Sequence, residues 1–252
     1  MTHSPRGSGP GTGGKEKEGA MRKIRAGIFG LLIAAASAWA ASAAWQADFT
    51  PTTYNPGVGD VVEFAVCETC LGSGGAYRYL WDFNNDGVVD MDTASPVTAW
   101  TFDAGGFYEV KLTIQDLGGR EVTRRKGVFV GPVPVYGVRQ AVPQEDGSVL
   151  ILISIHVVGE NSGFALIESI PLGWSQVVMD STGTFIRPHW NAEEHVIECS
   201  WLNLEPGIEV TFSYSLTRNY GDAAQRPTLS GELSGYAGGR FAAGICGELA
   251  VP

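Results

Sequence analysis

The sequence is poor in basic residues: 17 Lys and Arg stand against 27 Asp and Glu, which gives a formal net charge of −10 at pH 7. A protein that binds nucleic acid needs a basic face to neutralise phosphates. We therefore expect no nucleic-acid partner. An acidic excess of this size keeps an exported protein soluble and repels anionic surfaces.

The sequence also lacks helical periodicity, because no stretch of useful length repeats its apolar residues every 3.6 positions. Its apolar runs are short, and turn-forming residues recur between them, in a chain with 34 glycines and 13 prolines. Many short strands separated by turns are typical of an all-β protein. We predict an all-β fold with two tandem immunoglobulin-like β-sandwich domains after an N-terminal signal peptide.

The N-terminus predicts export. Residues 1–20 have no apolar period and are expected to be a disordered or non-native extension. Residues 21–43 show signal-peptide architecture, with a basic start, an apolar core over residues 28–36 and an Ala-Ser-Ala ending at Ala43. The apolar core is short for a membrane span. We expect a secreted or cell-surface protein with no stable span after cleavage, and an uncleaved anchor is the alternative.

Four cysteines follow the signal, and an even number in an oxidising compartment favours disulfides: Cys67, Cys70, Cys199 and Cys246. Their positions suggest a local pair, Cys67 with Cys70, and a long-range pair, Cys199 with Cys246, although four cysteines allow three connectivities. A C-x-x-C can also be a redox centre or half of a zinc site. Nothing near Cys70 predicts a helix, and no second C-x-x-C is present, which favours a structural disulfide.

The mature chain divides into residues 45–131 and 136–252, and the Pro-rich linker 132–135 lies between them. In the first part, alternating residues place apolar side chains on one face of each predicted strand. These faces hold Tyr77, Tyr79, Trp81 and Phe83 in one run and Val110, Leu112 and Ile114 in another.

The order YLWDF, SPVTAWTF and GGFYEVKLTIQDLGG resembles the PKD domain over about residues 45–131. The motif residues, in order, are Tyr79, Trp81, Asp82, Phe83, Ser95, Pro96, Phe102, Gly106, Tyr108, Val110, Leu112, Ile114, Asp116 and Gly119. The resemblance implies an immunoglobulin-like β-sandwich of the kind found on cell surfaces, with Trp81 between its two sheets. The chain departs from the family at the longer turn NNDGVVDMD and at the Cys67–Cys70 segment.

The acidic run from Asp82 to Asp90 has three interpretations. It matches the first part of a calcium loop, with candidate ligands Asp82, Asn84, Asp86, the Val88 carbonyl and Asp90, and with Gly87 at the sharp turn. Position twelve is Thr93, where such loops carry a bidentate Glu. A turn stabilised by Asx side chains without any metal is the second interpretation. Paired catalytic carboxylates are the third, although an exposed turn offers no cleft. No cofactor is required, and calcium is the one candidate.

Residues 136–252 predict a second β-sandwich of unknown type, built from runs such as GSVLILISIHVV and TFSYSLT. Its ESIPLGW segment resembles accessory β-sandwich modules of bacterial and archaeal surface proteins, without implying an activity. The domain lacks G-x-S-x-G and H-E-x-x-H motifs. Residues that could still carry chemistry or bind sugar are Glu168, Glu193, Glu194, Glu198, Glu205, His156, His189, His195, Trp174, Trp190 and Trp201.

We assign no catalytic residue. The sequence predicts a non-catalytic exported or cell-surface protein whose β-sandwiches contact an extracellular protein or polysaccharide or assemble on a surface. The alternative is a secreted hydrolase with its catalytic site in the C-terminal domain and the PKD-like domain as an accessory module.

Overall fold

A computed structural model describes residues 45–71, 75, 77–181, 185–219 and 227–251. The predicted extension 1–20 and the predicted signal peptide 21–43 lie outside the described residues. Within these ranges, no helix could span a membrane.

The described chain is all-β, as predicted, and its one helical element is the 3-10 turn η1 (Glu68–Leu71). The first half forms seven strands: β1 (Phe49–Pro51), β2 (Val61–Val66), β3 (Tyr77–Asp82), β4 (Met91–Thr93), β5 (Val97–Thr101), β6 (Gly106–Asp116) and β7 (Glu121–Val130). The second half forms ten: β8 (Val135–Pro143), β9 (Val149–Val157), β10 (Gly163–Ser169), β11 (Trp174–Ser181), β12 (Phe185–Asn191), β13 (Val196–Leu202), β14 (Glu209–Arg218), β15 (Ser230–Tyr236), β16 (Arg240–Gly244) and β17 (Cys246–Glu248).

One nine-stranded sheet runs through both halves of the chain, in the order β11-β14-β9-β8-β17-β7-β6-β3-β4. The three-stranded sheet β1-β2-β5 completes the first sandwich, and the five-stranded sheet β12-β13-β10-β15-β16 completes the second. The predicted sandwiches are therefore present, but they share a sheet.

The first core holds the aromatic residues of the sequence motif. Trp81 is fully buried, and its ring contacts Phe49 and Phe64 of the opposite sheet at centroid distances of 5.1 and 5.6 Å. Val110, Leu112 and Ile114 are also fully buried, as their alternation along β6 predicts. The Tyr108 hydroxyl donates to the Ala104 carbonyl at 3.0 Å and fixes the entry into β6.

The second core contains a buried ion pair among its aliphatic side chains. Arg139 on β8 and Glu168 on β10 are fully buried and form two parallel hydrogen bonds of 2.7 Å, from Nε to Oε1 and from Nη2 to Oε2. Tyr214 on β14 donates to the same Oε1 at 2.8 Å, and Arg139 Nη1 donates to the Glu248 carbonyl at 2.8 Å. Every oxygen of the carboxylate has a donor, which a buried charge requires.

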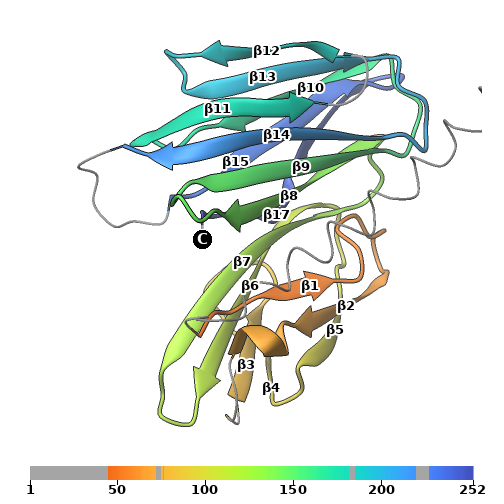
Figure 1. The fold of residues 1–252 in the computed structure, drawn as a ribbon. Helices are drawn as coiled ribbons and strands as arrows, with labels where there is room; N and C mark the ends of the chain where they lie inside the picture. Colours follow the sequence, from red (N-terminus) through yellow and green to blue (C-terminus); the bar gives the residue numbers. More distant parts are fainter. Residues whose placement is uncertain (1–44, 72–74, 76, 182–184, 220–226, 252) are drawn as a thin grey trace, which may run out of the picture. The chain divides into compact units, whose positions relative to one another are not determined.

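The last strand, β17, joins the two halves. It lies between β8, to which it runs parallel, and β7, to which it runs antiparallel (Figure 1). The Glu248 carboxylate lies 3.2 Å from Lys126 Nζ on β7. Lys126 Nζ also lies 2.8 Å from Asp48, at the start of the described chain. The three residues of β17, Cys246–Glu248, therefore connect both sandwiches.

Candidate functional site

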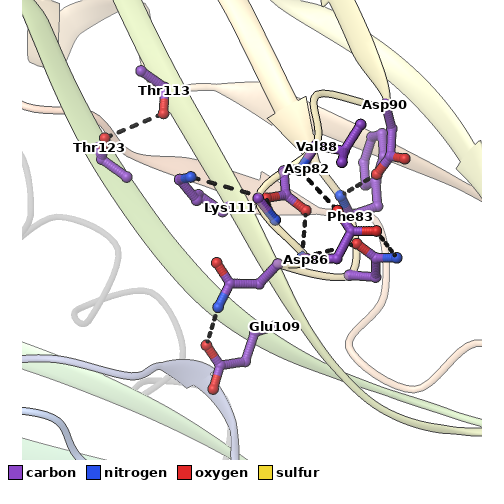
Figure 2. A network of polar contacts seen from close by, with 12 residues as sticks. Asp82, Phe83, Asp86, Val88, Asp90, Glu109, Lys111, Thr113 and Thr123 are labelled. Carbon is purple, nitrogen blue, oxygen red and sulfur yellow. Dashed lines mark hydrogen bonds and ion pairs between the residues drawn. The ribbon is translucent and has the colours of Figure 1, made fainter.

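The acidic turn after β3 is held together by its own side chains. Asp82 is 3% exposed, and its two carboxylate oxygens accept the backbone N–H groups of Asp86 and Gly87 at 3.1 and 3.0 Å. Lys111 Nζ on β6 lies 3.9 Å from the same carboxylate. Figure 2 shows Asp82 pointing into the turn, where it supplies the acceptors that the bent backbone lacks.

The other polar side chains of the turn also accept hydrogen bonds from its backbone N–H groups. Asp90 Oδ2 accepts the Phe83 N–H at 2.7 Å, and Asp86 Oδ1 accepts the Val88 N–H at 2.8 Å. Asn84 Oδ1 accepts the Asp86 N–H, and its amide donates to Asp86 Oδ2, both at 3.1 Å. The Asp86 N–H and Val88 N–H bonds are Asx-turn hydrogen bonds to a side chain two positions earlier. The Asn84–Asp86 bond joins two side chains, and the Phe83–Asp90 bond crosses the base of the loop.

Calcium needs six to eight oxygens directed at one point. Among the described residues, the one cluster of three carboxylate, thiol or imidazole groups with ligand atoms within 4.8 Å of one another is Asp48, Cys67 and Cys70. The aspartates of the acidic turn do not form such a cluster, and their inner oxygens already accept N–H groups. The geometry favours the Asx turn, and calcium at Asp82, Asn84, Asp86, Val88 and Asp90 stays a prediction.

Of the two predicted disulfides, Cys67–Cys70 is present, so these two sulfurs are not thiolate ligands. A Cys199–Cys246 disulfide is not, and that prediction is wrong: both side chains are buried thiols. Cys199 belongs to the core of the second sandwich. Cys246 points elsewhere, because its Sγ donates to the Tyr54 carbonyl at 3.5 Å, in the first half of the chain.

The acidic candidates of the second half do not form a site for acid–base chemistry. Glu168 is the fully buried partner of Arg139 and has no exposure to a substrate. Glu193 and Glu194 lie in an exposed turn capped by Asn191. Glu198 lies on the outer face of β13, opposite the exposed His189 of β12. A glycosidase needs two carboxylates facing one cleft, which this distribution does not provide.

The candidate tryptophans and histidines of the second half do not lie together in one site either. Trp201 is fully buried, and Trp174 and Trp190 pack partly against the core, so the three do not form an exposed platform. The His156 ring stacks on Tyr136 at 4.7 Å, and His195 meets the edge of Trp190 at 5.8 Å. Core packing and strand-end contacts account for these rings.

A groove crosses the outer face of the five-stranded sheet, and sequence reasoning did not predict it. It is shallow, with a volume of about 970 Å³. Its lining residues are Ser162, Gly163, Phe164, Ala165, Ser200, Leu202, Glu232, Ser234, Gly235, Tyr236, Arg240, Phe241 and Ala242. We call it the transverse groove.

Strand register creates this groove. A row of small side chains runs across four neighbouring strands, because Ser200 pairs with Ala165, Ala165 with Ser234, and Ser234 with Ala242. In the next row Gly163 lies between Leu202 and Tyr236, which are 52% and 57% exposed. Small residues therefore form the floor, and larger ones rise beside it.

The polar side chains of the transverse groove are available to a ligand. In the described part of the chain, those of Ser200, Glu232, Ser234, Tyr236 and Arg240 make no hydrogen bond or ion pair with other residues. In this they differ from Asp82 and Arg139, whose polar atoms are occupied. The sequence signal was the alternation of small outward residues in GFA and GELSGY, which acquires meaning only once the register is known.

Three solved structures illustrate the architectures to which the chain is similar. A carbohydrate-binding module of the β-sandwich superfamily is 15% identical, over 70% of this chain and 92% of its own, with a TM-score of 0.31. The major pilin SpaD of Corynebacterium diphtheriae is 6% identical, over 69% and 60%, with a TM-score of 0.38. Chitinase ChiA74 of Bacillus thuringiensis is 12% identical, over 68% and 26%, with a TM-score of 0.35. Similarities this low carry no functional inference.

The comparison with curated proteins gives no match. A family model matches the first sandwich, on the strands that carry the Trp81 and Tyr108 motifs. Residues 51–126 match the PKD domain, which confirms the resemblance for this part of the chain.

Proposed function

We propose that the chain is an exported, non-catalytic protein that binds an extended ligand in the transverse groove of its second sandwich. One observation carries this proposal: a solvent-facing groove whose polar side chains have no partners in the described chain. Binding sites commonly combine an apolar lining with a few convergent polar groups, and this groove has both.

The rest of the molecule supports a binding role over a catalytic one. The buried carboxylate of the second sandwich belongs to a satisfied ion pair, and the acidic turn of the first sandwich satisfies its own backbone. Neither leaves a charged group poised for proton transfer, which a hydrolase requires. We propose that the PKD-like sandwich, joined to the second by the shared sheet, holds the groove at a fixed orientation outside the cell.

The test is a binding screen of residues 44–252 against polysaccharides, oligosaccharides and extracellular proteins. The groove is blocked by Ser234→Trp, a partly buried outward position at its centre. The matched control is Ser215→Trp, a position of the same residue type that is also partly buried, on β14 of the other sheet. Binding that Ser234→Trp removes and Ser215→Trp preserves would support the proposal. Binding that both variants retain would refute it, and turnover of any substrate would favour the hydrolase.

A further inference from the structure

We infer that the ligand of the transverse groove is an extended, uncharged oligosaccharide. This inference rests on the proposed function and specifies the chemistry of the ligand. It is drawn from three properties of the groove: its occupied backbone, the kinds of side chain it presents, and its charge.

The backbone at the centre of the groove floor, on β10 and β15, cannot pair with a ligand. β10 is hydrogen-bonded to β13 on one side and to β15 on the other, and β15 is also hydrogen-bonded to β16. A peptide that binds by strand addition needs a free sheet edge. The groove runs across these strands as far as the edge strand β16. A ligand that lies across the strands cannot extend their hydrogen-bond ladder, so it must be held by side chains.

The side chains of the groove combine one exposed ring with scattered hydrogen-bonding groups. The Tyr236 ring is more than half exposed and offers a flat apolar face. The same lining holds the hydroxyls of Ser200 and Ser234, the Glu232 carboxylate and the Arg240 guanidinium. A sugar ring matches this set, because its C–H face packs on an aromatic ring while its hydroxyls both donate and accept hydrogen bonds.

The charge of the lining argues for an uncharged ligand. Glu232 and Arg240 are the acidic and the basic residue of the lining, so their charges cancel. A ligand with many charges of one sign would meet one favourable and one unfavourable group. Sugar hydroxyls can donate to Glu232 and accept from Arg240, which gives charge-assisted hydrogen bonds to both. The net charge of −10 disfavours an anionic polysaccharide further.

The dimensions of the groove suit a chain more than a single sugar. The row of small residues crosses four neighbouring strands. Because neighbouring strands lie about 4.8 Å apart, the two outer strands of the row are about 15 Å apart. The groove is shallow and follows the sheet surface, so it can hold several consecutive rings of a longer polymer.

The experiment measures binding of residues 44–252 by NMR titration and calorimetry. The neutral probes are hexaoses with glucose, xylose, mannose and N-acetylglucosamine units; the contrasting probes are an oligogalacturonate and a proline-rich peptide. The variants are Ser234→Trp, Tyr236→Ala, Glu232→Gln and the control Ser215→Trp. We expect at least one neutral hexaose to bind, with affinity lowered at least about tenfold by Tyr236→Ala, abolished by Ser234→Trp and unchanged by Ser215→Trp.

Two results would overturn the inference in different ways. Binding of only the oligogalacturonate or only the peptide, sensitive to Ser234→Trp, would overturn the ligand class and leave the proposed function standing. Absence of any Ser234→Trp-sensitive binding to these probes and to the wider screen would overturn both. Circular dichroism of each variant verifies that lost binding is not lost folding.

Discussion

Gly231 lies directly opposite Glu168 in the pairing of β15 with β10, and only a residue without a side chain fits there. A Cβ atom at position 231 would overlap Glu168 Oε2 and come within 2.9 Å of Arg139 Nη2. The glycine is therefore part of the buried ion pair, because its missing side chain provides the space that the carboxylate and the guanidinium occupy.

Gly231→Ala should destabilise the fold by displacing this ion pair. Breaking the geometry of a buried pair costs about 3–5 kcal/mol in the free energy of unfolding. Urea denaturation followed by tryptophan fluorescence measures the loss. The control is Gly239→Ala, where an added Cβ meets no atom within 4 Å, and it should change stability by less than about 0.5 kcal/mol. Equal losses in the two variants would contradict the role of Gly231.

The same network predicts a loss of stability at alkaline pH. Burial, and then the neighbouring Glu168 carboxylate, raise the pKa of Tyr214 well above its ordinary value of 10.0. A group whose pKa is raised by folding contributes stability that is complete below its unfolded pKa and is lost as pH rises towards the folded pKa. The free energy of unfolding should therefore fall above pH 10, and less steeply in Tyr214→Phe. Denaturant midpoints between pH 8 and 11 measure this, and parallel profiles would argue against it.

Sequence reasoning predicted the first sandwich well because its signals are local. Trp81, Val110 and Leu112 belong to alternating runs whose buried face is set by their own strand. The same alternation contained a signal that was missed. Arg139 lies in phase with Val135 on β8, and Glu168 lies in phase with Leu166 on β10, so two opposite charges occupy core positions. Opposite charges in phase with core residues indicate a buried pair.

The shared sheet and the groove could not be predicted in this way. β17 has three residues, which is too short to show an alternation of apolar and polar side chains. Its partners on β7 and β8 lie more than a hundred positions earlier in the sequence. The transverse groove depends on which residues of four strands stand side by side. Alternation along each strand gives the outward residues, but the pairing of Ala165 with Ser200 and Ser234 is a matter of register.

The two thiols of the second half can be counted directly. Burial raises the pKa of Cys246 to about 12, so the native thiol is both inaccessible and protonated near pH 8. Ellman's reagent without reductant should find no reactive thiol in the native protein and two per chain in guanidinium. No thiol after unfolding would show that Cys199 and Cys246 had formed a disulfide after all.

The acidic turn should depend on Asp82 whether or not calcium is present. Asp82→Asn keeps one acceptor oxygen and loses the other, so it should cost about 1–3 kcal/mol in both millimolar calcium and chelator. The melting temperature of the unsubstituted protein should be the same in the two buffers. A calcium-dependent rise that Asp82→Asn and Asp86→Asn abolish would establish the metal site, because a ligand that binds only the native state stabilises it.

The shared sheet predicts that the two sandwiches unfold together and that one glycine of β17 controls this coupling. Gly247 has φ +79°, and an added Cβ would overlap the Arg139 carbonyl oxygen on β8. Gly238 has a similar φ of +70° with no atom within 4 Å of its Cβ position. Both alanine variants carry the cost of a left-handed residue, about 1–2 kcal/mol, and only Gly247→Ala adds the collision. Calorimetry should show one transition for the unsubstituted protein and Gly238→Ala, and two for Gly247→Ala. A single shared transition in Gly247→Ala would mean that other contacts, such as those of Glu248 with Lys126, suffice to couple the halves.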